Sequence, residues 1–419
     1  MLDIKLIRQQ PEEVRAALAR RDPGLVGVVD EILEQDREWR AATTSAEDLR
    51  GKQRTVGMTQ ALASHQGSST PRLRAELKRV SAKAKELGEA ANRAKRELDE
   101  LLLRLPNLPD PSAAPGPEDE LIHKGGDLRA FDFPVRDHLE LAGPMIDVER
   151  AAKLSGARFA YLKGDLVLLE LALVRWVLEK LRGHGFEPVV PPVLVRERAL
   201  FGTGFLPDTE QQIYSLPADE LYLVGTSEVA LASLHAEEII DTERLPLRYA
   251  GFSPCFRREA GAAGKDTRGI FRVHQFDKVE MFSFVEPASS GEEHERILTI
   301  EEEILRELGL PYRVVNIAVT DLGSSAAKKY DCEVYLPSQG RYRELTSCSN
   351  TTDYQARRLS IRVRREKRTE TLHTLNGTAA AVGRTLIALL ENGQREDGSV
   401  ALPACLLPFG APAELPAAA

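Results

Sequence analysis

Two long stretches near the start of the chain carry apolar residues at alternating spacings of four and three. The pattern occupies Leu25, Val28, Ile32, Gln35, Trp39, Ala42, Ala46 and Leu49, and then Leu73, Leu77, Val80, Ala84, Leu87, Ala91, Ala94, Leu98, Leu101 and Leu105. This alternation is the seam of a coiled coil. Between the two stretches, SHQGSSTP is rich in residues that break helices. The pattern predicts an antiparallel helical hairpin with its tip near Gly67, whose helices of about 40 residues would each reach roughly 60 Å.

The rest of the chain follows a different pattern. Residues 166–181 form an apolar helical stretch that ends at GHG, and PVVPPVLV after it is expected to be an extended strand. Strand-like runs then occur among helices such as HERILTIEEEILRELG; they are ELYLV, KVEMFSFV, YRVVNIAV, CEVYLP and YRELTSCS. Strands that are grouped, and not regularly interleaved with helices, predict an α+β domain in which helices pack on an antiparallel sheet.

These patterns divide the chain into four parts. We expect a helical domain over 1–105, a Pro-rich acidic linker over 106–120, a second domain over 121–410 and a frayed tail over 411–419.

The composition excludes several classes of protein. Of 419 residues, 42% are hydrophobic and 29% are charged, no apolar run is long enough to span a membrane, and the N-terminus has no signal core. We therefore expect a cytoplasmic protein with no membrane partner. Four cysteines without a CxxC pair predict neither a disulfide framework nor a structural zinc site.

Charge is distributed unevenly. The formal net charge of −8 argues by itself against a nucleic-acid partner. Residues 50–96, however, contain twelve basic and three acidic residues, a local charge of +9 on the hairpin. Such an arm suits either a polyanion or, as the simpler alternative, a dimerisation coil with a solvated basic face.

One segment, CFRREAGAAGKDTRGIFRVHQFDKVE, combines strand-like patterning with many polar residues. Residues two apart in a strand project to one face, so Arg257 and Glu259 would share a face. After a glycine-rich loop, a return strand would present Arg272, His274, Phe276 and Glu280 together. Guanidinium groups bind phosphates and a Phe ring can stack on a purine, which suits a nucleoside triphosphate. The alternative is a charged ribbon that faces solvent.

Three further patches have a similar character. GTSEV presents Thr226 and Glu228, and ELTSCSN places Glu344 and Ser347 where they could share a magnesium ion. HTLNGTAAAVGRTLIALLEN is expected to run from a turn at 376–377 into an apolar helix with a lone Arg384. That arginine needs an anionic partner, either a ligand or a nearby carboxylate. The chain contains no P-loop, no HEXXH motif and no GxGxxG fingerprint after a strand.

Together these motifs resemble those of the seryl-tRNA synthetases, which are class II aminoacyl-tRNA synthetases. GFEPVVPPVLV resembles motif 1 of the class, FRREAG through RVHQF resembles motif 2, and NGTAAAVGRTL resembles motif 3. GTSEV, VHQFDKVE and ELTSCSN, with the basic hairpin, make the serine assignment specific. The resemblance covers nearly the whole chain and implies a tRNA-binding arm followed by a class II catalytic domain.

The resemblance also implies roles for individual residues. Arg257, Glu344 and Arg384 would be catalytic, and Glu344 and Ser347 would bind Mg²⁺. Serine would be bound by Thr226, Ser227, Glu228, Arg257, Glu280, Asn376 and Thr378. ATP would be bound by Arg257, Arg258, Glu259, Arg272, Val273, Phe276, Glu344, Leu345, Thr346, Ser347 and Arg384. The arm would contact tRNA through Arg50, Lys52, Arg54, Arg72, Arg74, Lys78, Arg79 and Lys83.

The implied reaction is ATP-dependent activation of L-serine to seryl-adenylate, followed by transfer of the seryl group to tRNA(Ser) and, by the same resemblance, tRNA(Sec). A homodimer is implied as well. The chain departs from the family at Thr378, Ala379 and Thr346, where methyl groups are added beside the expected serine pocket. These substitutions suggest a duplicate synthetase that resists a serine-analogue inhibitor, with ordinary sequence drift as the alternative. An amino acid:carrier-protein ligase and a non-catalytic RNA-binding protein are two further alternatives.

Overall fold

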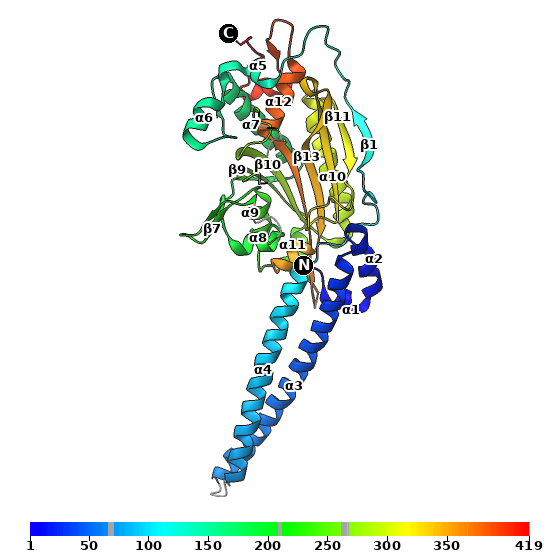
Figure 1. Cartoon of the computed structure of the whole chain (residues 1–419), viewed down its shortest axis with the longest axis vertical. Helices are drawn as coiled ribbons and strands as arrows, with labels where there is room; N and C mark the ends of the chain where they lie inside the picture. The colour runs from blue at the N-terminus through cyan, green and yellow to red at the C-terminus, as the bar shows by residue number, and fades with distance from the viewer. Residues whose placement is uncertain (66–70, 208–211, 261–265, 267, 367, 419) are drawn as a thin grey trace. The chain divides into compact units, whose positions relative to one another are not determined.

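The computed structural model describes the whole chain except residues 66–70, 208–211, 261–265, 267, 367 and 419. The chain divides into two compact units, Met1–Leu108 and Pro109–Ala419 (Figure 1). No helix of the described residues is both long enough and apolar enough to cross a membrane.

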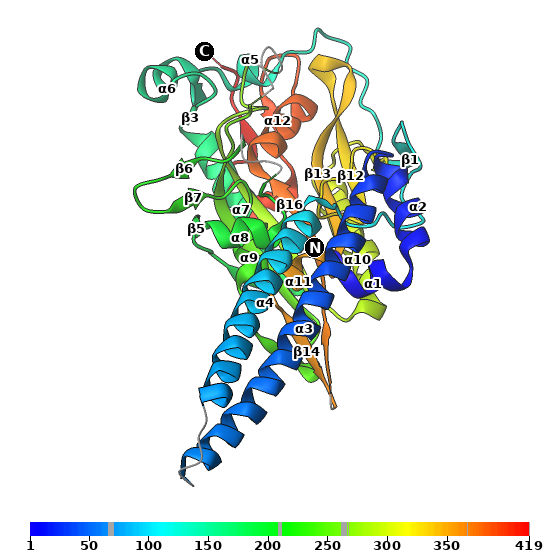
Figure 2. The ribbon, with the colours of Figure 1, turned by 60° about the horizontal axis from the view of Figure 1, so that its bottom comes forward.

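Within the described residues, the regular elements of the first unit are all helices. Its elements are α1 (Ile4–Gln9), α2 (Pro11–Arg21), α3 (Leu25–His65) and α4 (Pro71–Arg104). Helices α3 and α4 run side by side as the predicted hairpin (Figure 2). Every residue of the two predicted seams is buried or partly buried, because the four-three spacing keeps one stripe of each helix against the other. The predicted tip at Gly67 lies outside the described residues.

The base of the hairpin has a hydrophobic core of its own. Leu98, Leu102 and Leu105 pack with Val29 and Ile32, and α1 and α2 close this cluster. Residues nearer the far end of the hairpin do not take part in it. The packing of the base therefore does not depend on side chains of that distal half.

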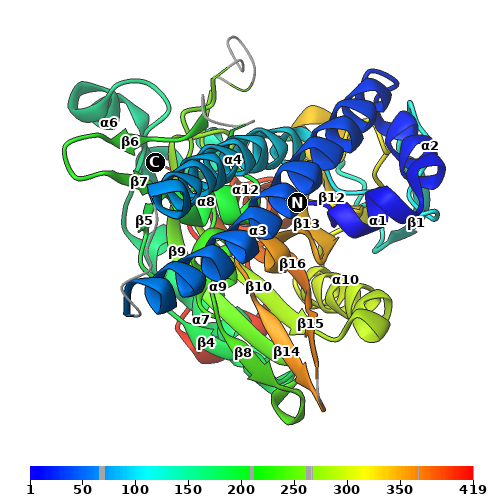
Figure 3. The same cartoon turned by 90° about the horizontal axis from the view of Figure 1, so that it is seen from below.

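The second unit is built on an eight-stranded sheet in the order β1-β11-β12-β13-β16-β10-β9-β4 (Figure 3). In that order the strands span Glu120–Gly125, Tyr312–Asn316, Lys328–Leu336, Arg341–Thr352, His373–Ala381, Gln275–Val285, Leu247–Phe256 and Glu187–Val189. All pairs are antiparallel except β4 with β9. Helices α7 (Asp165–Gly183), α10 (Ser290–Glu307) and α12 (Val382–Gly393) share the main apolar core with this sheet. The α+β prediction is confirmed.

Smaller elements surround this core. They include helices α5 (His138–Ala142), α6 (Val148–Ser155), α8 (Glu197–Thr203), α9 (Glu228–Ser233) and α11 (Tyr354–Arg358), and strands β2 (Ile146–Asp147), β3 (Tyr161–Leu162), β5 (Leu194–Arg196), β6 (Ser215–Leu216), β7 (Leu221–Leu223), β8 (Ile239–Asp241), β14 (Arg362–Arg365) and β15 (Arg368–Thr371). The ELYLV run forms β7 in a separate three-stranded sheet with β5 and β6. PVVPPVLV is not one strand but is divided between β4 and β5, because two consecutive prolines cannot donate ladder hydrogen bonds.

Two predicted boundaries are wrong. Residues 109–120 are part of the second unit, where Ala113 and Ala114 are buried and the Asp110 amide donates to the Ala327 carbonyl at 2.9 Å. The tail is not frayed around Leu415, which is fully buried in β18 (Glu414–Leu415) against β17 (Val400–Ala401). In both segments a few small or apolar side chains pack on the core. A composition rich in Pro and Ala does not reveal such packing, so the sequence indicated a linker and a frayed tail.

The predicted turn at Asn376 and Gly377 is also wrong, because both residues lie inside strand β16. The glycine is needed there for space. A Cβ atom on Gly377 would lie 2.3 Å from Ile297 Cγ2 and 2.9 Å from Glu301 Oε1, both on α10. The Asn-Gly pair therefore reflects the close approach of a helix to the sheet.

Candidate active site

The predicted hairpin of motif 2 is formed by β9 and β10, in which Phe256 pairs with Gln275. Alternate residues of β10 project to one face, so Phe276, Lys278 and Glu280 lie in a row. Phe276 and Lys278 border a cavity whose lining also includes Arg257, Glu259, Ile270, Phe271, Arg272, Val273, Glu344, Leu345, Ser347, Thr378, Ala381, Gly383 and Arg384. Four separate segments of the sequence thus converge on one cavity.

A β-bulge brings the two predicted magnesium ligands together. Glu344 and Ser347 are three residues apart and would face opposite sides of a regular strand. The pairing of β12 with β13 shifts by one residue between Thr346 and Glu344, so that both predicted ligands line the cavity. Thr346 faces the other way and donates a hydrogen bond to Glu301 Oε2 at 2.9 Å.

A second bulge lies where β10 pairs with β16. Glu280 pairs with Thr378, whereas Val279 pairs with Ala380, so Ala379 is the extra residue. Ala379 is buried in the main apolar core and does not line the cavity. Of the three departures from the family, Thr378 alone borders the cavity, whereas Ala379 and Thr346 are turned away from it.

Positive charge dominates the cavity. Arg257 holds the Gly225 carbonyl through Nε at 3.1 Å, and its guanidinium lies 5.3 Å from the centre of the Phe276 ring. Arg384 lies 4.7 Å from the Phe271 ring centre and donates to the Glu344 carbonyl at 2.9 Å. Crowded guanidinium groups repel one another unless an anion lies between them, so the cavity suits a polyanionic ligand.

Glu344 is held in its charged form. Burial by itself raises the pKa of this carboxyl, but the positive charges of Lys329, Arg384 and Arg257 outweigh that effect and lower the pKa below its ordinary value. Its carboxylate also lies 3.5 Å from Arg384 Nη1. A charged carboxylate and the Ser347 hydroxyl are oxygen ligands of the kind that Mg²⁺ accepts. The residues present therefore fit that ion.

A buried polar cluster adjoins the cavity. Thr226 donates its hydroxyl to Glu280 Oε2 at 3.2 Å, and Lys278 forms an ion pair with the same carboxylate. Glu228 Oε1 accepts hydrogen bonds from Asn376 Nδ2 at 3.0 Å and from the amide of Gln355 at 2.7 Å. The cluster places two carboxylates and a hydroxyl where a small amphoteric molecule could bind.

Burial raises the pKa of Glu228 to about 7, and the negative charge of Glu280 adds to the effect. The hydrogen bond from Gln355 and the charges of Lys278 and Arg257 act in the opposite direction. Glu228 consequently changes its charge near neutral pH.

Apart from the members of the polar cluster, three predicted site residues lie outside the cavity lining. Arg258 is exposed, and Thr346 faces α10. Ser227 is fully buried, and its side chain packs close to Gly251. A Cβ atom added to that glycine would lie 3.1 Å from Ser227 Oγ. None of these three side chains borders the cavity.

Two buried polar residues of the site, Lys278 and Gln355, were missed. Lys278 could have been found, because it lies midway between Phe276 and Glu280 on the same strand face. Gln355 gave no signal, because it comes from helix α11, beyond the motifs, and reaches the site only through the fold.

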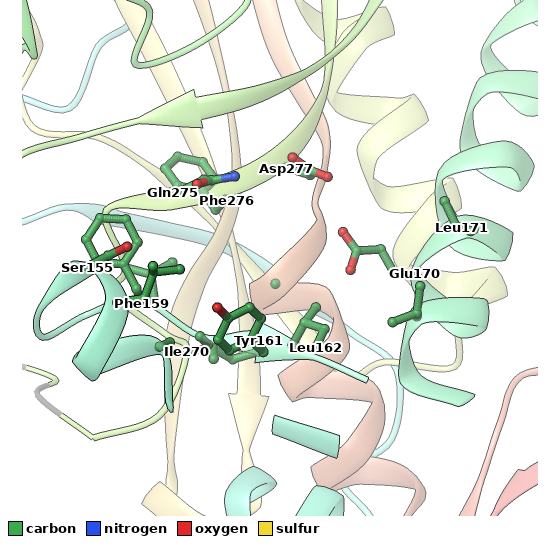
Figure 4. Close-up of a pocket in the computed structure, with 16 residues that line it drawn as sticks. Ser155, Phe159, Tyr161, Leu162, Glu170, Leu171, Ile270, Gln275, Phe276 and Asp277 are labelled. Carbon is green, nitrogen blue, oxygen red and sulfur yellow. The ribbon is translucent and has the colours of Figure 1, made fainter. Parts of the chain in front are cut away.

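A second hollow of about 530 Å³ adjoins the cavity and shares Ile270, Val273, Phe276 and Gly383 with it. Figure 4 shows Glu170 of α7 and Asp277 of β10 pointing toward one another in its wall. Burial raises the pKa of Glu170 to about 7, and the Asp277 charge contributes.

Comparisons with known proteins agree with this geometry. Residues 1–109 match the family described as the seryl-tRNA synthetase N-terminal domain, and residues 214–393 match the class II core domain of the G, H, P, S and T synthetases. The serine--tRNA ligase of Streptomyces coelicolor is 50% identical over 418 residues, which are 98% of this chain and 97% of that protein. The chain belongs to the seryl-tRNA synthetase family. It is therefore a class II aminoacyl-tRNA synthetase.

Solved structures of the family superimpose closely on this one. Seryl-tRNA synthetase from Pyrococcus horikoshii, crystallised with ATP, is 41% identical, with a TM-score of 0.94 and full coverage of both chains. The cytoplasmic serine-tRNA ligase of Naegleria fowleri, crystallised with AMP, is 32% identical, with a TM-score of 0.88 and 99% coverage of each chain. The synthetase resemblance inferred from the motifs is confirmed.

The helical arm of this family member is basic over its outer half. All eight residues predicted to contact tRNA are exposed. Four basic residues lie in the first turns of α4 and three in the second half of α3; these are Arg72, Arg74, Lys78 and Arg79, and Arg50, Lys52 and Arg54. A shallow hollow on the arm is lined by Arg50, Arg54 and Leu77 together with Gln53, Gly57 and Ser81.

Proposed function

We propose that the cavity binds ATP and that the adjoining polar cluster binds L-serine, so that the enzyme forms seryl-adenylate. The observation that carries this proposal is the junction of a cavity lined by guanidinium groups with a buried cluster of carboxylates and hydroxyls. In this reaction a serine carboxylate oxygen attacks the α-phosphorus of ATP, and pyrophosphate leaves. The seryl group then passes to the terminal ribose of tRNA(Ser).

The cationic side chains act on the phosphates. Arg257, between the two sites, bridges the α-phosphate and the serine carboxylate, and Arg384 holds the γ-phosphate. Arg272 and Phe276 enclose the adenine, whose edge meets the Val273 backbone and Glu259. Fixed positive charges stabilise the negative charge that develops on phosphorus, so no protein nucleophile is needed.

Serine is recognised through its polar groups. Glu228 receives the ammonium group, and Glu280, supported by Thr226, accepts the side-chain hydroxyl. A site that requires this hydrogen bond discriminates against alanine, because the buried carboxylate would otherwise lack a partner. Thr378 and Asn376 complete the wall of this site.

Mg²⁺ would be held by Glu344 and Ser347. The ion supplies further positive charge to the phosphates when it is bound. The carboxylate of Glu344 stays charged at neutral pH under the influence of its cationic neighbours, and this prepares the site.

Exchange of labelled pyrophosphate into ATP tests the proposal directly. We expect exchange to require L-serine and Mg²⁺, and to fall at least about a hundredfold in Arg257→Ala, because one charge-assisted contact is lost in the transition state. Folded enzyme that gave no serine-dependent exchange would contradict the proposal.

Several finer assignments belong to the same proposal. The basic arm binds tRNA(Ser), and charging of tRNA(Sec) is a further expectation that assays with each purified tRNA would test. The enzyme works in the cytoplasm as a homodimer. The exposed apolar side chains of α7 support a dimer, since Leu168 and Leu171 are 51% and 57% exposed on one face of that helix.

The hypothesis of an inhibitor-resistant duplicate now depends on Thr378. Its extra methyl group borders the cavity and would crowd a bulky serine analogue. A seryl-adenylate analogue should inhibit Thr378→Ser more strongly than wild type. Equal inhibition constants would leave sequence drift as the explanation.

A further inference from the structure

Gln355 is a buried side chain of the serine site that none of the recognised motifs contains. It lies on helix α11 and is fully inaccessible to solvent. Its Nε2 donates hydrogen bonds to Glu228 Oε1 at 2.7 Å and to the Thr203 carbonyl at 3.2 Å. Both amide protons are therefore used, one of them on the carboxylate.

The other end of this amide is fixed as well. Gln355 Oε1 accepts a hydrogen bond from the Thr374 hydroxyl at 3.0 Å. Thr351, which donates to the Thr374 carbonyl at 2.7 Å, lies against the same oxygen at 3.4 Å. Because the Thr203 carbonyl and the Glu228 carboxylate can only accept, the nitrogen must face these two groups. The side chain thus connects β13 and β16 to the carboxylate in one orientation.

We infer that Gln355 is a positioning residue for substrate recognition, whose amide aims the Glu228 carboxylate at the ammonium group of serine. This inference rests on the proposed role of Glu228 in serine binding. A carboxylate held by two neutral amides, those of Gln355 and Asn376, keeps an oxygen available for the substrate. Without the amide of Gln355, the carboxylate of Glu228 would be held by Asn376 alone and would lose the shorter of its two hydrogen bonds.

The surrounding charges give this role a measurable signature. Glu228 faces Glu280 and Lys278 on β10 and Arg257 at the end of β9, and burial raises its pKa to about 7. The hydrogen bond from Gln355 stabilises the charged form, so loss of the amide raises that pKa further. Only the carboxylate pairs with an ammonium group, so kcat/KM for serine rises with pH through this pKa.

The test compares Gln355→Leu with wild type by serine-dependent pyrophosphate exchange between pH 6 and pH 9. We expect KM for serine to rise about tenfold or more, as for the loss of a hydrogen bond to a charged group. KM for ATP should change less than about twofold, a difference too small to reflect a lost contact. The rising limb of the kcat/KM profile for serine should move to higher pH.

Gln394→Leu is the matched control. Gln394 is also fully buried, and it bonds the backbone of Arg136 away from the site. This variant should lose stability as Gln355→Leu does. Its KM for serine and the pH dependence of its kcat/KM for serine should be the same as in the wild type. Thermal unfolding of both variants separates a general loss of stability from the specific effect.

Three results would overturn the inference: an unchanged serine KM in Gln355→Leu, an equal rise in both KM values, or an unmoved pH limb. If that variant does not fold, Gln355→Glu keeps the size of the side chain and brings a second carboxyl against Glu228. In Gln355→Glu, the rising limb of kcat/KM for serine should move to still higher pH. A limb at the wild-type position would overturn the inference. So would a flat wild-type profile. Wild-type enzyme without any serine-dependent exchange would instead contradict the proposed function.

Discussion

At the scale of single residues, Glu228 combines the proposed role in serine binding with a cost in stability. Burial raises its pKa from the ordinary 4.5 to about 7, so the folded protein binds this proton more tightly than the unfolded chain. The contribution of Glu228 to stability is therefore greatest below pH 4.5, and it falls as the pH rises through about 7. At pH 8 the charged carboxylate opposes folding.

Glu228→Gln should consequently stabilise the protein at pH 8 by about 2 kcal/mol and much less at pH 5, because one pKa unit corresponds to about 1.4 kcal/mol. The same variant should lose most serine-dependent exchange, because a neutral amide attracts an ammonium group weakly. Urea unfolding at both pH values measures the first effect. Glu292→Gln, at an exposed glutamate of α10, is the control and should change neither property. Equal stability of Glu228→Gln and wild type at pH 8 would contradict the prediction.

Gly377 is a second position where one atom matters. An added Cβ would lie 2.3 Å from Ile297 Cγ2, so α10 would have to move away from β16. Gly377→Ala should destabilise the protein by about 1–3 kcal/mol or more, as overpacking of a core does. Gly291→Ala on α10 is the control, because no atom lies within 4 Å of its Cβ position. Thermal unfolding measures both variants. An unfolding temperature of Gly377→Ala as high as that of the control would refute the packing argument.

At the scale of elements, the two strand bulges decide which side chains meet the ligand. One of them brings Glu344 and Ser347 to the same cavity, and the other moves Ala379 into the core. Strand periodicity alone assigns these residues to the wrong faces. The helical arm, by contrast, follows its seven-residue pattern throughout the described part, because the same stripe of each helix faces the other along the hairpin.

The arm can be shortened without removing its base. Deleting residues 51–85 and joining the ends by a short Gly-Ser turn retains the apolar cluster formed by Val29, Ile32, Leu98 and Leu102. We expect charging of tRNA(Ser) to fall by about a hundredfold or more, because most phosphate-neutralising cations are lost. Serine-dependent pyrophosphate exchange should be kept, since all residues of the cavity lie in the second unit. Charging at the wild-type rate would mean that the arm has only a structural role.

At the scale of the whole molecule, the net charge of −8 is an average over unlike parts. The first 110 residues carry about +2, which leaves −10 for the remainder. In the proposed function, the basic arm attracts the polyanionic tRNA and the acidic body repels it. The distribution therefore favours one mode of approach for the RNA.

The proposed dimer also belongs to this scale. Leu168 and Leu171 are exposed on one face of α7, and Leu154 and Val190 are 72% and 80% exposed. Leu168→Asp/Leu171→Asp should convert dimers to monomers in sedimentation experiments, because charges cannot be buried unpaired in an interface. Glu179→Lys, at a polar position of the same helix, is the control for altered charge alone. Monomeric wild-type protein would contradict the proposal.

The sequence by itself determined the features that depend on local periodicity and on motif chemistry. The seam of the arm, the row of Phe276 and Glu280 on β10, and the serine-type motifs could all be recognised without coordinates. A helix pair or a strand face repeats at a fixed interval, so neighbours along the chain suffice to define it.

Only the tertiary structure decided the features that depend on neighbours far apart in the sequence. The bulge between Glu344 and Ser347 depends on strand β12, and Gly377 is explained by a helix on the far side of the sheet. Gln355 reaches Glu228 across 127 residues of sequence. Packing and buried hydrogen bonds join groups that share no local pattern, so the final arrangement of the serine site follows from the fold.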